Sequence, residues 1–268
     1  MRRNCFWLAA TATVGCFALA SVASGAVFGV TVDGPDAIFL AGRTDVVIPA
    51  ANLPWTGPPG GFLIRHGGPT PEEALEQFPD SIPVSGGDVI RVLDPAVGGV
   101  NFFNGLGPDF FGPGGNGLQG SNLTSLGGIS GYIGPQGPLA GVFLDNSIPN
   151  GSPPATLNFS PAGLGIDFPT LSPLLGQVFY IGDGVTSGNQ FQTFIAPAGA
   201  TRLFLGIPDG FGFVGGPGAY DDNDGSYQVR VGVNEIPTRA DVPEPASLTL
   251  WCLGAMGVAI ARRRRKSA

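Results

Sequence analysis

Apolar and polar residues alternate in short runs along most of this chain, and Gly or Pro separates the runs about every ten residues. Short alternating runs rich in Val, Ile and Phe are typical of β-strands rather than helices. The pattern predicts one or two strands in the segment 27–51 and further strands at 88–93, 99–103, 129–133, 141–144, 178–181, 190–196, 201–207 and 226–233. It favours an all-β, jelly-roll-like β-sandwich with long Gly/Pro-rich loops.

The pattern predicts only one helix between the two ends of the chain. Thr70 is an N-cap residue, Pro71 suits the first helical position, and two glutamates follow, so we expect a short helix to about Phe78. Segments 105–122 and 145–174 have little periodicity and are predicted loops. The 45 Gly and 26 Pro residues approach low-complexity values, but frequent aromatic and β-branched residues indicate folded strands rather than disorder.

The first 26 residues have the features of a secretory signal peptide. Arg2 and Arg3 precede an apolar run at 6–20, and Ser24-Gly25-Ala26 is a suitable cleavage site before Val27. A transmembrane anchor fits less well because the run is short and ends in small residues. A lipoprotein site at Cys16 is the other alternative, but Thr13 stands where a leucine is expected. We therefore expect an exported ectodomain at residues 27–240.

Composition limits the chemistry of this ectodomain. Its stability cannot depend on disulfides, because Cys5 and Cys16 lie in the signal and Cys252 lies near the C-terminus. Residues 27–242 contain nineteen carboxylates, six arginines and no lysine, a formal charge of −13. Nucleic acid is excluded as a partner, since its binding requires cations that neutralise phosphates. Divalent cations suit such a domain, and an acidic surface kept for solubility is the simpler alternative.

The last 28 residues, 241–268, form a distinct array. A box of Val242, Pro243, Glu244 and Pro245 precedes sixteen uncharged residues, Ala246–Ala261, and a basic run, Arg262, Arg263, Arg264, Arg265 and Lys266. As a helix the uncharged segment would reach about 24 Å, slightly short of a hydrocarbon core of about 30 Å, and the arginines favour a cytoplasmic end. The prolines keep the box extended and open to a processing enzyme. The simplest interpretation is a C-terminal transmembrane anchor.

The box, the short apolar helix and the basic cluster, in this order, closely resemble the PEP-CTERM sorting signal of exported bacterial proteins. The resemblance implies recognition of the Pro-Glu-Pro box by an exosortase-type membrane protease, followed by removal of the helix and the basic run. The protein would be held transiently in the inner membrane by its C-terminal helix and then delivered to the cell surface or extracellular matrix. Such a signal specifies an address rather than an activity.

The ectodomain has few groups for catalysis. His66 is the only histidine, and without Cys or Lys most nucleophilic schemes and a zinc site of His and Cys are excluded. A glycoside hydrolase that uses a pair of acids remains an alternative, although no spacing marks such a pair. The chain is therefore predicted not to be an enzyme.

One segment gathers the ligands that calcium prefers. Five oxygen-bearing side chains lie within residues 221–226, one loop after Asp209, and the predicted ligands are Asp209, Asp222, Asn223 and Asp224. The EF-hand pattern fails, because Tyr220 occupies the position of its first Asp and Val231 that of its last Glu. The alternative is an acidic β-turn, since Asn-Asp-Gly is also a hairpin signal.

The order of Asp209, a loop, residues 222–227 and a final strand resembles the end of the calcium-dependent galactose-binding lectin of PA-IL type, with weaker similarity at 87–90 and 139–142. The resemblance implies a galactose-binding-like sandwich in which Asp209, Asp222 and Asn223 hold calcium, the carbonyl of Phe103 or Asn104 adds a ligand, and calcium binds sugar hydroxyls. The longer loop after Asp209 and the insertion at 145–174 depart from that family, and its sugar-contacting residues are not recognisable.

Together these observations predict a non-enzymatic surface or matrix protein that makes a calcium-dependent contact with extracellular polysaccharide. Two alternatives remain open. One is a purely structural matrix protein whose calcium only braces loops, and the other is the acid-pair glycoside hydrolase.

Overall fold

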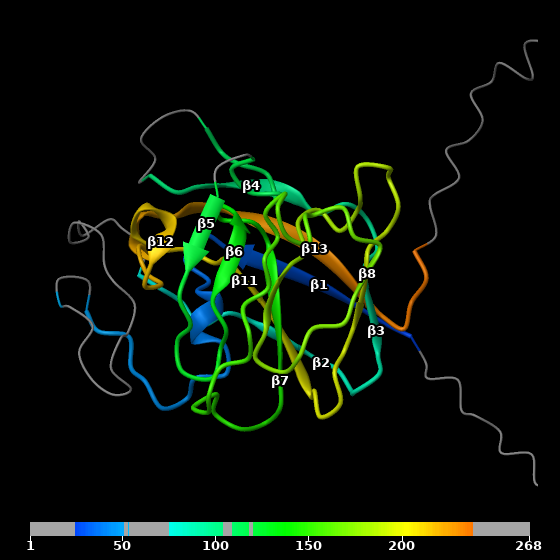
Figure 1. Cartoon of the computed structure of the whole chain (residues 1–268), viewed down its shortest axis with the longest axis horizontal. Helices are drawn as coiled ribbons and strands as arrows, with labels where there is room; N and C mark the ends of the chain where they lie inside the picture. The colour runs from blue at the N-terminus through cyan, green and yellow to red at the C-terminus, as the bar shows by residue number, and fades with distance from the viewer. Residues whose placement is uncertain (1–24, 51–52, 54–74, 104–108, 118–119, 238–268) are drawn as a thin grey trace, which may run out of the picture.

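The computed structural model describes residues 25–50, 53, 75–103, 109–117 and 120–237, and within them it confirms an all-β protein (Figure 1). The described segments contain thirteen strands, and their only helices are three 3-10 turns: η1 (Ile38–Leu40), η2 (Phe211–Phe213) and η3 (Tyr220–Asp222). The predicted signal peptide and C-terminal helix lie outside the described residues.

The longest strand, β13 (Asp224–Val233), is the centre of the largest sheet. One edge of β13 pairs with all of β1 (Ala26–Asp33). The other edge is divided between β4 (Val97–Asn101) and β3 (Val89–Val92), and the sheet continues through β10 (Thr193–Ile195) to β8 (Thr170–Leu171).

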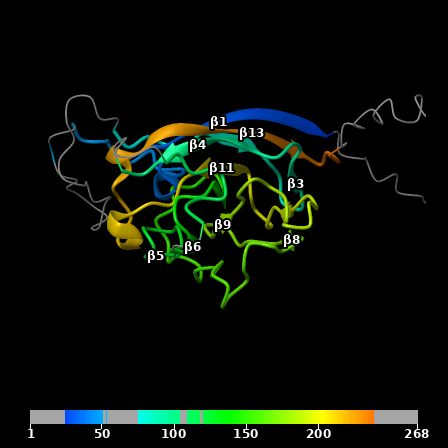
Figure 2. The same ribbon diagram turned by 90° about the horizontal axis from the view of Figure 1, so that it is seen from above.

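Two smaller sheets lie against this one. The first has the order β2 (Ser81–Pro83), β11 (Arg202–Gly206), β7 (Ala140–Leu144) and β9 (Val178–Tyr180). The second consists of β12 (Val214–Gly215), β5 (Gly120–Leu123) and β6 (Tyr132–Pro135). Figure 2 shows β1, β13 and β4 along the upper side of the molecule, with β9, β6 and β5 below them, which gives a sandwich-like arrangement.

Aromatic side chains join the sheets into one core. The ring centroid of Phe179 on β9 lies 5.2 Å from that of Phe143 on β7 and 5.1 Å from that of Phe194 on β10, which belongs to the largest sheet. Rings at these separations bury large apolar areas in both layers. All core residues that the structure describes lie between Val32 and Val233, and therefore within the predicted ectodomain 27–240.

Most predicted strands are confirmed, with shifted ends, but the prediction of a helix to Phe78 is wrong in its described part. Residues 75–78 are not helical, and residues 70–74 lie outside the described part. Gln77 forms a parallel bridge with Asp36: its N–H donates to the carbonyl of Pro35, and its own carbonyl accepts the N–H of Ala37. Phe78 also precedes a proline, which disfavours helical backbone there. Tertiary pairing overrode the local helix signal.

Candidate metal centre

Asp209 lies in the loop that leaves β11, and its side chain is 2% exposed. Its Oδ1 accepts the N–H of Gly210 at 2.6 Å, and its backbone carbonyl accepts the N–H of Gly218 at 3.0 Å. The hydroxyl of Tyr220 accepts the backbone N–H of Asp209 at 3.1 Å and donates to the carbonyl of Ile207 at 2.7 Å. These contacts close the loop and bring the end of β11 next to η3.

Asn223 connects this loop to a third segment of the chain. It follows η3 in extended backbone, and its buried side-chain Nδ2 donates to the carbonyl of Gly34 at 3.1 Å, just beyond β1. A Cβ on Gly34 would lie 3.0 Å from both the carbonyl carbon and the Cβ of Asn223, so a side chain at residue 34 would crowd this contact. The N–H of Gly34 donates to the carbonyl of Gly225 at 2.9 Å. Segments near residues 34, 209 and 223 therefore meet at one point.

The electrostatic environment of Asp209 disfavours its charged form. Burial is the main cause that raises its pKa well above the ordinary value, and the charges of Asp222 and Asp221 raise it further. Hydrogen bonds from the backbone of Gly210 and the side chain of Asn223 oppose the shift without removing it. A cation at this point would reverse that balance, because it favours ionised carboxylates.

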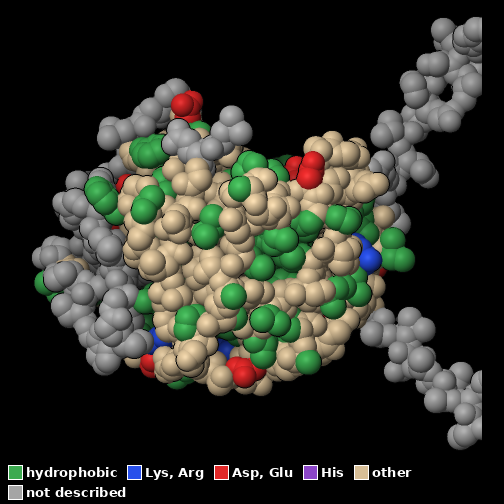
Figure 3. All heavy atoms as spheres, viewed as in Figure 1, with side chains coloured by type: hydrophobic (Ala, Val, Ile, Leu, Met, Phe, Trp, Pro, Cys, Tyr) green, Lys and Arg blue, Asp and Glu red, His purple; other side chains and the backbone are tan. Residues whose placement is uncertain are grey.

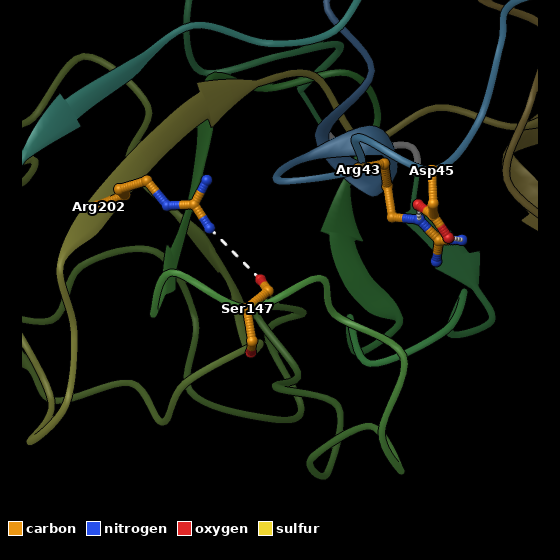
Figure 4. A network of polar contacts seen from close by, with 4 residues as sticks. All are labelled: Arg43, Asp45, Ser147 and Arg202. Atoms are coloured by element: carbon orange, nitrogen blue, oxygen red, sulfur yellow. Dashed lines mark hydrogen bonds and ion pairs between the residues drawn. The ribbon is translucent and has the colours of Figure 1, made fainter.

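The described arginines are engaged elsewhere. Arg43 pairs with Asp45, Arg91 donates to the carbonyl of Glu235, Arg202 to the carbonyls of Asp145 and Ser147, and Arg230 pairs with Asp94. Figure 4 shows two of these groups, with Arg43 and Asp45 side by side and Arg202 directed toward Ser147. On the face seen in Figure 3, acidic side chains form separate spots rather than one patch. Asp209 and Asp221 are themselves buried, at 2% exposed each.

Asn223 carries a polar atom without a hydrogen-bond partner. Its Oδ1 is buried and accepts no hydrogen bond, and buried amide oxygens are seldom left so. Within the described residues no group of three or more His, Cys, Asp or Glu side chains is arranged to hold a metal ion. A hard cation would therefore need the amide oxygen of Asn223 or backbone carbonyls beside the carboxylates of Asp209 and Asp222, a mixture that calcium accepts.

The structure brings together three of the four predicted ligands. Asp209, half-buried Asp222 and buried Asn223 lie in one cluster. Asp224 is exposed and opens β13 opposite Asn101 of β4, so it does not belong to the buried part. Asp221, which the sequence showed in the same acidic run but which was not among the predicted ligands, is buried and near enough to raise the pKa of Asp209.

The proposed carbonyl ligand from Phe103 or Asn104 is only partly located. Phe103 lies just after β4, and its N–H donates to Oδ1 of Asn101 at 2.9 Å. Asn104 lies outside the described residues.

A second acidic group lines an open hollow of about 540 Å³ between β1 and β2, where Asp33, Asp36 and Asp80 lie. Burial is the main cause that raises the pKa of Asp36 to about 7, and the charges of Asp33 and Asp80 add to it. In contrast to Asn223, Asp36 is engaged: its Oδ2 accepts the backbone N–H of Asp33 at 2.8 Å.

Comparison with known proteins identifies one end of the chain. Residues 241–266 match the model of the PEP-CTERM protein-sorting motif, and the match includes Val242, Pro243, Glu244, Pro245 and Arg262, Arg263, Arg264, Arg265. No curated protein and no solved structure matches the chain, so no relative supports the lectin resemblance. No helix among the described residues is long and apolar enough to cross a membrane, and the tail itself lies outside them. The chain thus carries the sorting motif of an exosortase substrate.

Proposed function

We propose that this chain is an exported, non-enzymatic surface or matrix protein whose β-sandwich domain is braced by Ca²⁺ at Asp209, Asp222 and Asn223. The sorting motif indicates export and processing by an exosortase at the membrane. The brace is the first of the two alternatives to polysaccharide binding, and the geometry favours it over sugar contact. Asp209 and Asn223 are each only 2% exposed, so a cation between them would have little room for sugar hydroxyls.

The observation that carries the proposal is a buried carboxylate beside a buried amide oxygen that accepts no hydrogen bond. Both groups are electron-rich, and neighbouring acids increase the negative potential at Asp209. Calcium binds mixtures of carboxylate, amide and backbone carbonyl oxygens and would remove the repulsion. Because the cluster joins the ends of β1 and β11 to the start of β13, one cation would stabilise three segments that are distant in the sequence.

Polysaccharide contact is the second candidate function, and one observation favours it. The exposed Asp224 starts β13, and the next residue, Gly225, lies against the exposed ring of Phe110: a Cβ on Gly225 would lie 2.9 Å from that ring. An acid and an aromatic ring side by side on the surface suit the hydroxyls and the apolar face of a sugar. In this second candidate function, calcium at Asp209, Asp222 and Asn223 would order the loop that precedes Asp224, and the sugar would contact Asp224 and Phe110.

The remaining alternative, an acid-pair glycoside hydrolase, would use the hollow of Asp33, Asp36 and Asp80. A carboxyl with a pKa of about 7 could serve as a general acid. However, the carboxylate of Asp36 already holds the turn after β1 through the N–H of Asp33. We therefore assign Asp36 a structural role.

Calorimetric titration of the purified fragment 27–240 with CaCl₂ after EDTA treatment tests the brace. We expect one saturable site in the wild type, loss of binding in Asp222→Ala, and unchanged binding in Asp80→Ala. Arg65 lies outside the described residues. The Arg65→Gln variant tests whether the guanidinium of Arg65, rather than calcium, neutralises the acids around Asp209. Absence of calcium binding to the wild type would refute the brace. A glycan array with and without EDTA decides whether sugar binding accompanies it.

The sorting motif has a separate test. Glu244 is the only charged residue in its Pro-Glu-Pro box, so Glu244→Ala should block processing by the exosortase while leaving membrane insertion intact. Immunoblotting of membrane and released fractions would show accumulation of the uncleaved form. Deletion of residues 248–266 should instead release the ectodomain as soluble material. Wild-type processing of the Glu244→Ala protein would mean that this box is not what the protease reads.

A further inference from the structure

β1 is an edge strand along its whole length. It pairs with β13 over eight residues in continuous register, from Ala26 opposite Val233 to Asp33 opposite Ser226, without a bulge. Among the described strands none pairs with its other edge. Figure 2 shows β1 at the outer side of its layer. Unpaired backbone groups on such an edge offer a template for another strand.

The hydrogen-bonding pattern shows which groups of β1 face outward. The N–H of Gly34 bonds to Gly225 directly beyond the ladder, and bonded pairs alternate in antiparallel strands. Residues 28, 30 and 32 therefore bond to β13, whereas the N–H and C=O groups of Val27, Gly29 and Thr31 point to the free edge. The N–H of Asp33 also points away from β13, where the carboxylate of Asp36 accepts it. The free edge thus consists of Val27, Gly29 and Thr31.

Other edges of the described sheets are shorter or interrupted. β8 has two residues and follows Pro169, and β2 has three residues and ends at Pro83. β4 contains Gly98 with a positive φ of 104°. Short length, proline and irregular backbone protect edges from pairing, and β1 has none of these features. Its residues 26–32 also carry no charge.

We propose that β1 is a self-association surface, on which β1 of a second copy pairs antiparallel about a two-fold axis at Gly29. In this register Gly29 lies opposite Gly29 of the second copy, and Val27 lies opposite Thr31. All outward groups are then used, in about six hydrogen bonds. A two-fold axis makes the surface self-complementary, as homodimer formation requires.

The inner face of β1 fits the same register. Phe28 and Val30 are only half-buried and line the hollow between β1 and β2. The two-fold places Phe28 of one copy opposite Val30 of the other, and aromatic and β-branched side chains form favourable cross-strand pairs. The partner strand would extend the sheet over the hollow and cover apolar surface that is now half-open.

Charge also selects a second copy in this orientation. Asp33 is the only charged residue of β1, and the register places it beyond Val27, the first residue of the cleaved second copy, rather than opposite another acid. Cleavage before Val27, as expected from the sequence, would place the new amino terminus of one copy opposite Thr31 of the other. Thr31 lines the same hollow as Asp33, Asp36 and Asp80, so the positively charged amino terminus would lie beside an acidic hollow.

Cysteine cross-linking tests the surface and its register, because the fragment 27–240 contains no cysteine. Cα atoms of a bonded antiparallel pair are about 5.5 Å apart, within the range of about 4.4–6.8 Å that a disulfide spans. Gly29→Cys should therefore give a disulfide dimer under mild oxidation. Thr31→Cys should not, because its two copies would be about 13 Å apart along the strands. Val97→Cys, at an exposed position on β4 of the same sheet, is the matched control.

Sedimentation velocity of the same fragment gives the second readout. We expect the wild type to form a dimer in a concentration-dependent way. Its dimerisation affinity should rise with salt, because salt screens the repulsion between two acidic domains. Gly29→Lys should make it monomeric without unfolding, since no atom lies within 4 Å of the added Cβ and two lysines would meet at the axis. A monomeric wild type up to about 1 mM, or cross-linking of Val97→Cys instead of Gly29→Cys, would overturn the proposal. If the wild type dimerises but Gly29→Cys forms no disulfide, the copies associate in another way, such as exchange of β1. That result would also overturn the proposed pairing of β1 with β1.

Discussion

The two acidic groups of the domain differ in how their oxygens are satisfied. In the hollow, Oδ2 of Asp36 accepts the N–H of Asp33 and fixes the turn after β1. In the candidate metal centre, Oδ1 of the buried Asn223 accepts no hydrogen bond, although acids crowd around Asp209. Burial raises the pKa of an acid in each group. Both groups contain several acids, so the proposed cation site at Asp209 rests on the unmet oxygen of Asn223 rather than on the number of acids.

The largest expected difference between the candidate metal centre and the hollow is the effect of calcium on thermal stability. A ligand that binds only the folded state at a hundredfold excess over Kd stabilises it by about 2.7 kcal/mol. For a domain of this size we expect a rise in Tm of roughly 5–10 °C in millimolar calcium relative to EDTA. Asp222→Ala should abolish most of this difference, and Asp80→Ala in the hollow should preserve it. Scanning calorimetry measures both, and equal effects of the two variants would remove the distinction between the groups.

The hydroxyl of Tyr220, which is not among the described residues that line the hollow, holds the loop of Asp209 in the candidate metal centre. It accepts the N–H of Asp209 and donates to the carbonyl of Ile207, and all three groups are buried. Tyr220→Phe would leave the buried N–H of Asp209 without its acceptor, whereas the carbonyl of Ile207 would still accept the N–H of Ile38. The free energy of unfolding should therefore fall by about 1–2 kcal/mol. Calcium affinity should fall with it, because Asp209 would be less well positioned. Urea denaturation and calcium titration test this, and unchanged affinity would show that the loop does not need Tyr220.

Some strands and most of the candidate ligands could be predicted from the sequence, whereas contacts between distant segments could not. The short apolar runs of the sequence predicted β3, β7, β9, β11 and β13. These strands were predictable because their Val, Ile, Leu and Phe side chains are buried in the core. The acidic run 221–226 and Asp209 predicted a calcium site, and the structure brings three of its four predicted ligands, Asp209, Asp222 and Asn223, together; calcium binding itself stays a prediction. Local patterns could not show that Gly34 would contact Asn223, since that contact joins segments 189 residues apart. The hollow was missed for the same reason, because Asp36 follows β1 and Asp80 precedes β2, which are far apart in the sequence.

Removing the charge of Asp36 should change the free energy of unfolding less than the variants above. Its folded-state pKa of about 7 is above the ordinary value of 3.8, so between these values the folded protein holds a proton that the unfolded chain has released. The contribution of Asp36 to stability is therefore present below about pH 4 and is lost as the pH rises through about 7. Asp36→Asn keeps an oxygen for the N–H of Asp33 but cannot ionise, so it removes this part of the pH dependence.

At pH 8 we expect Asp36→Asn to be more stable than the wild type by about 1 kcal/mol, less than the full shift implies, because water in the open hollow screens the charge. At pH 4 the two proteins should unfold at the same urea concentration. Urea denaturation at pH 4, 6 and 8 at one fixed calcium concentration isolates the residue, since the metal centre is unchanged in the variant. Parallel pH profiles for the two proteins would mean that Asp36 titrates in its ordinary range, and that burial perturbs only the acids around Asp209.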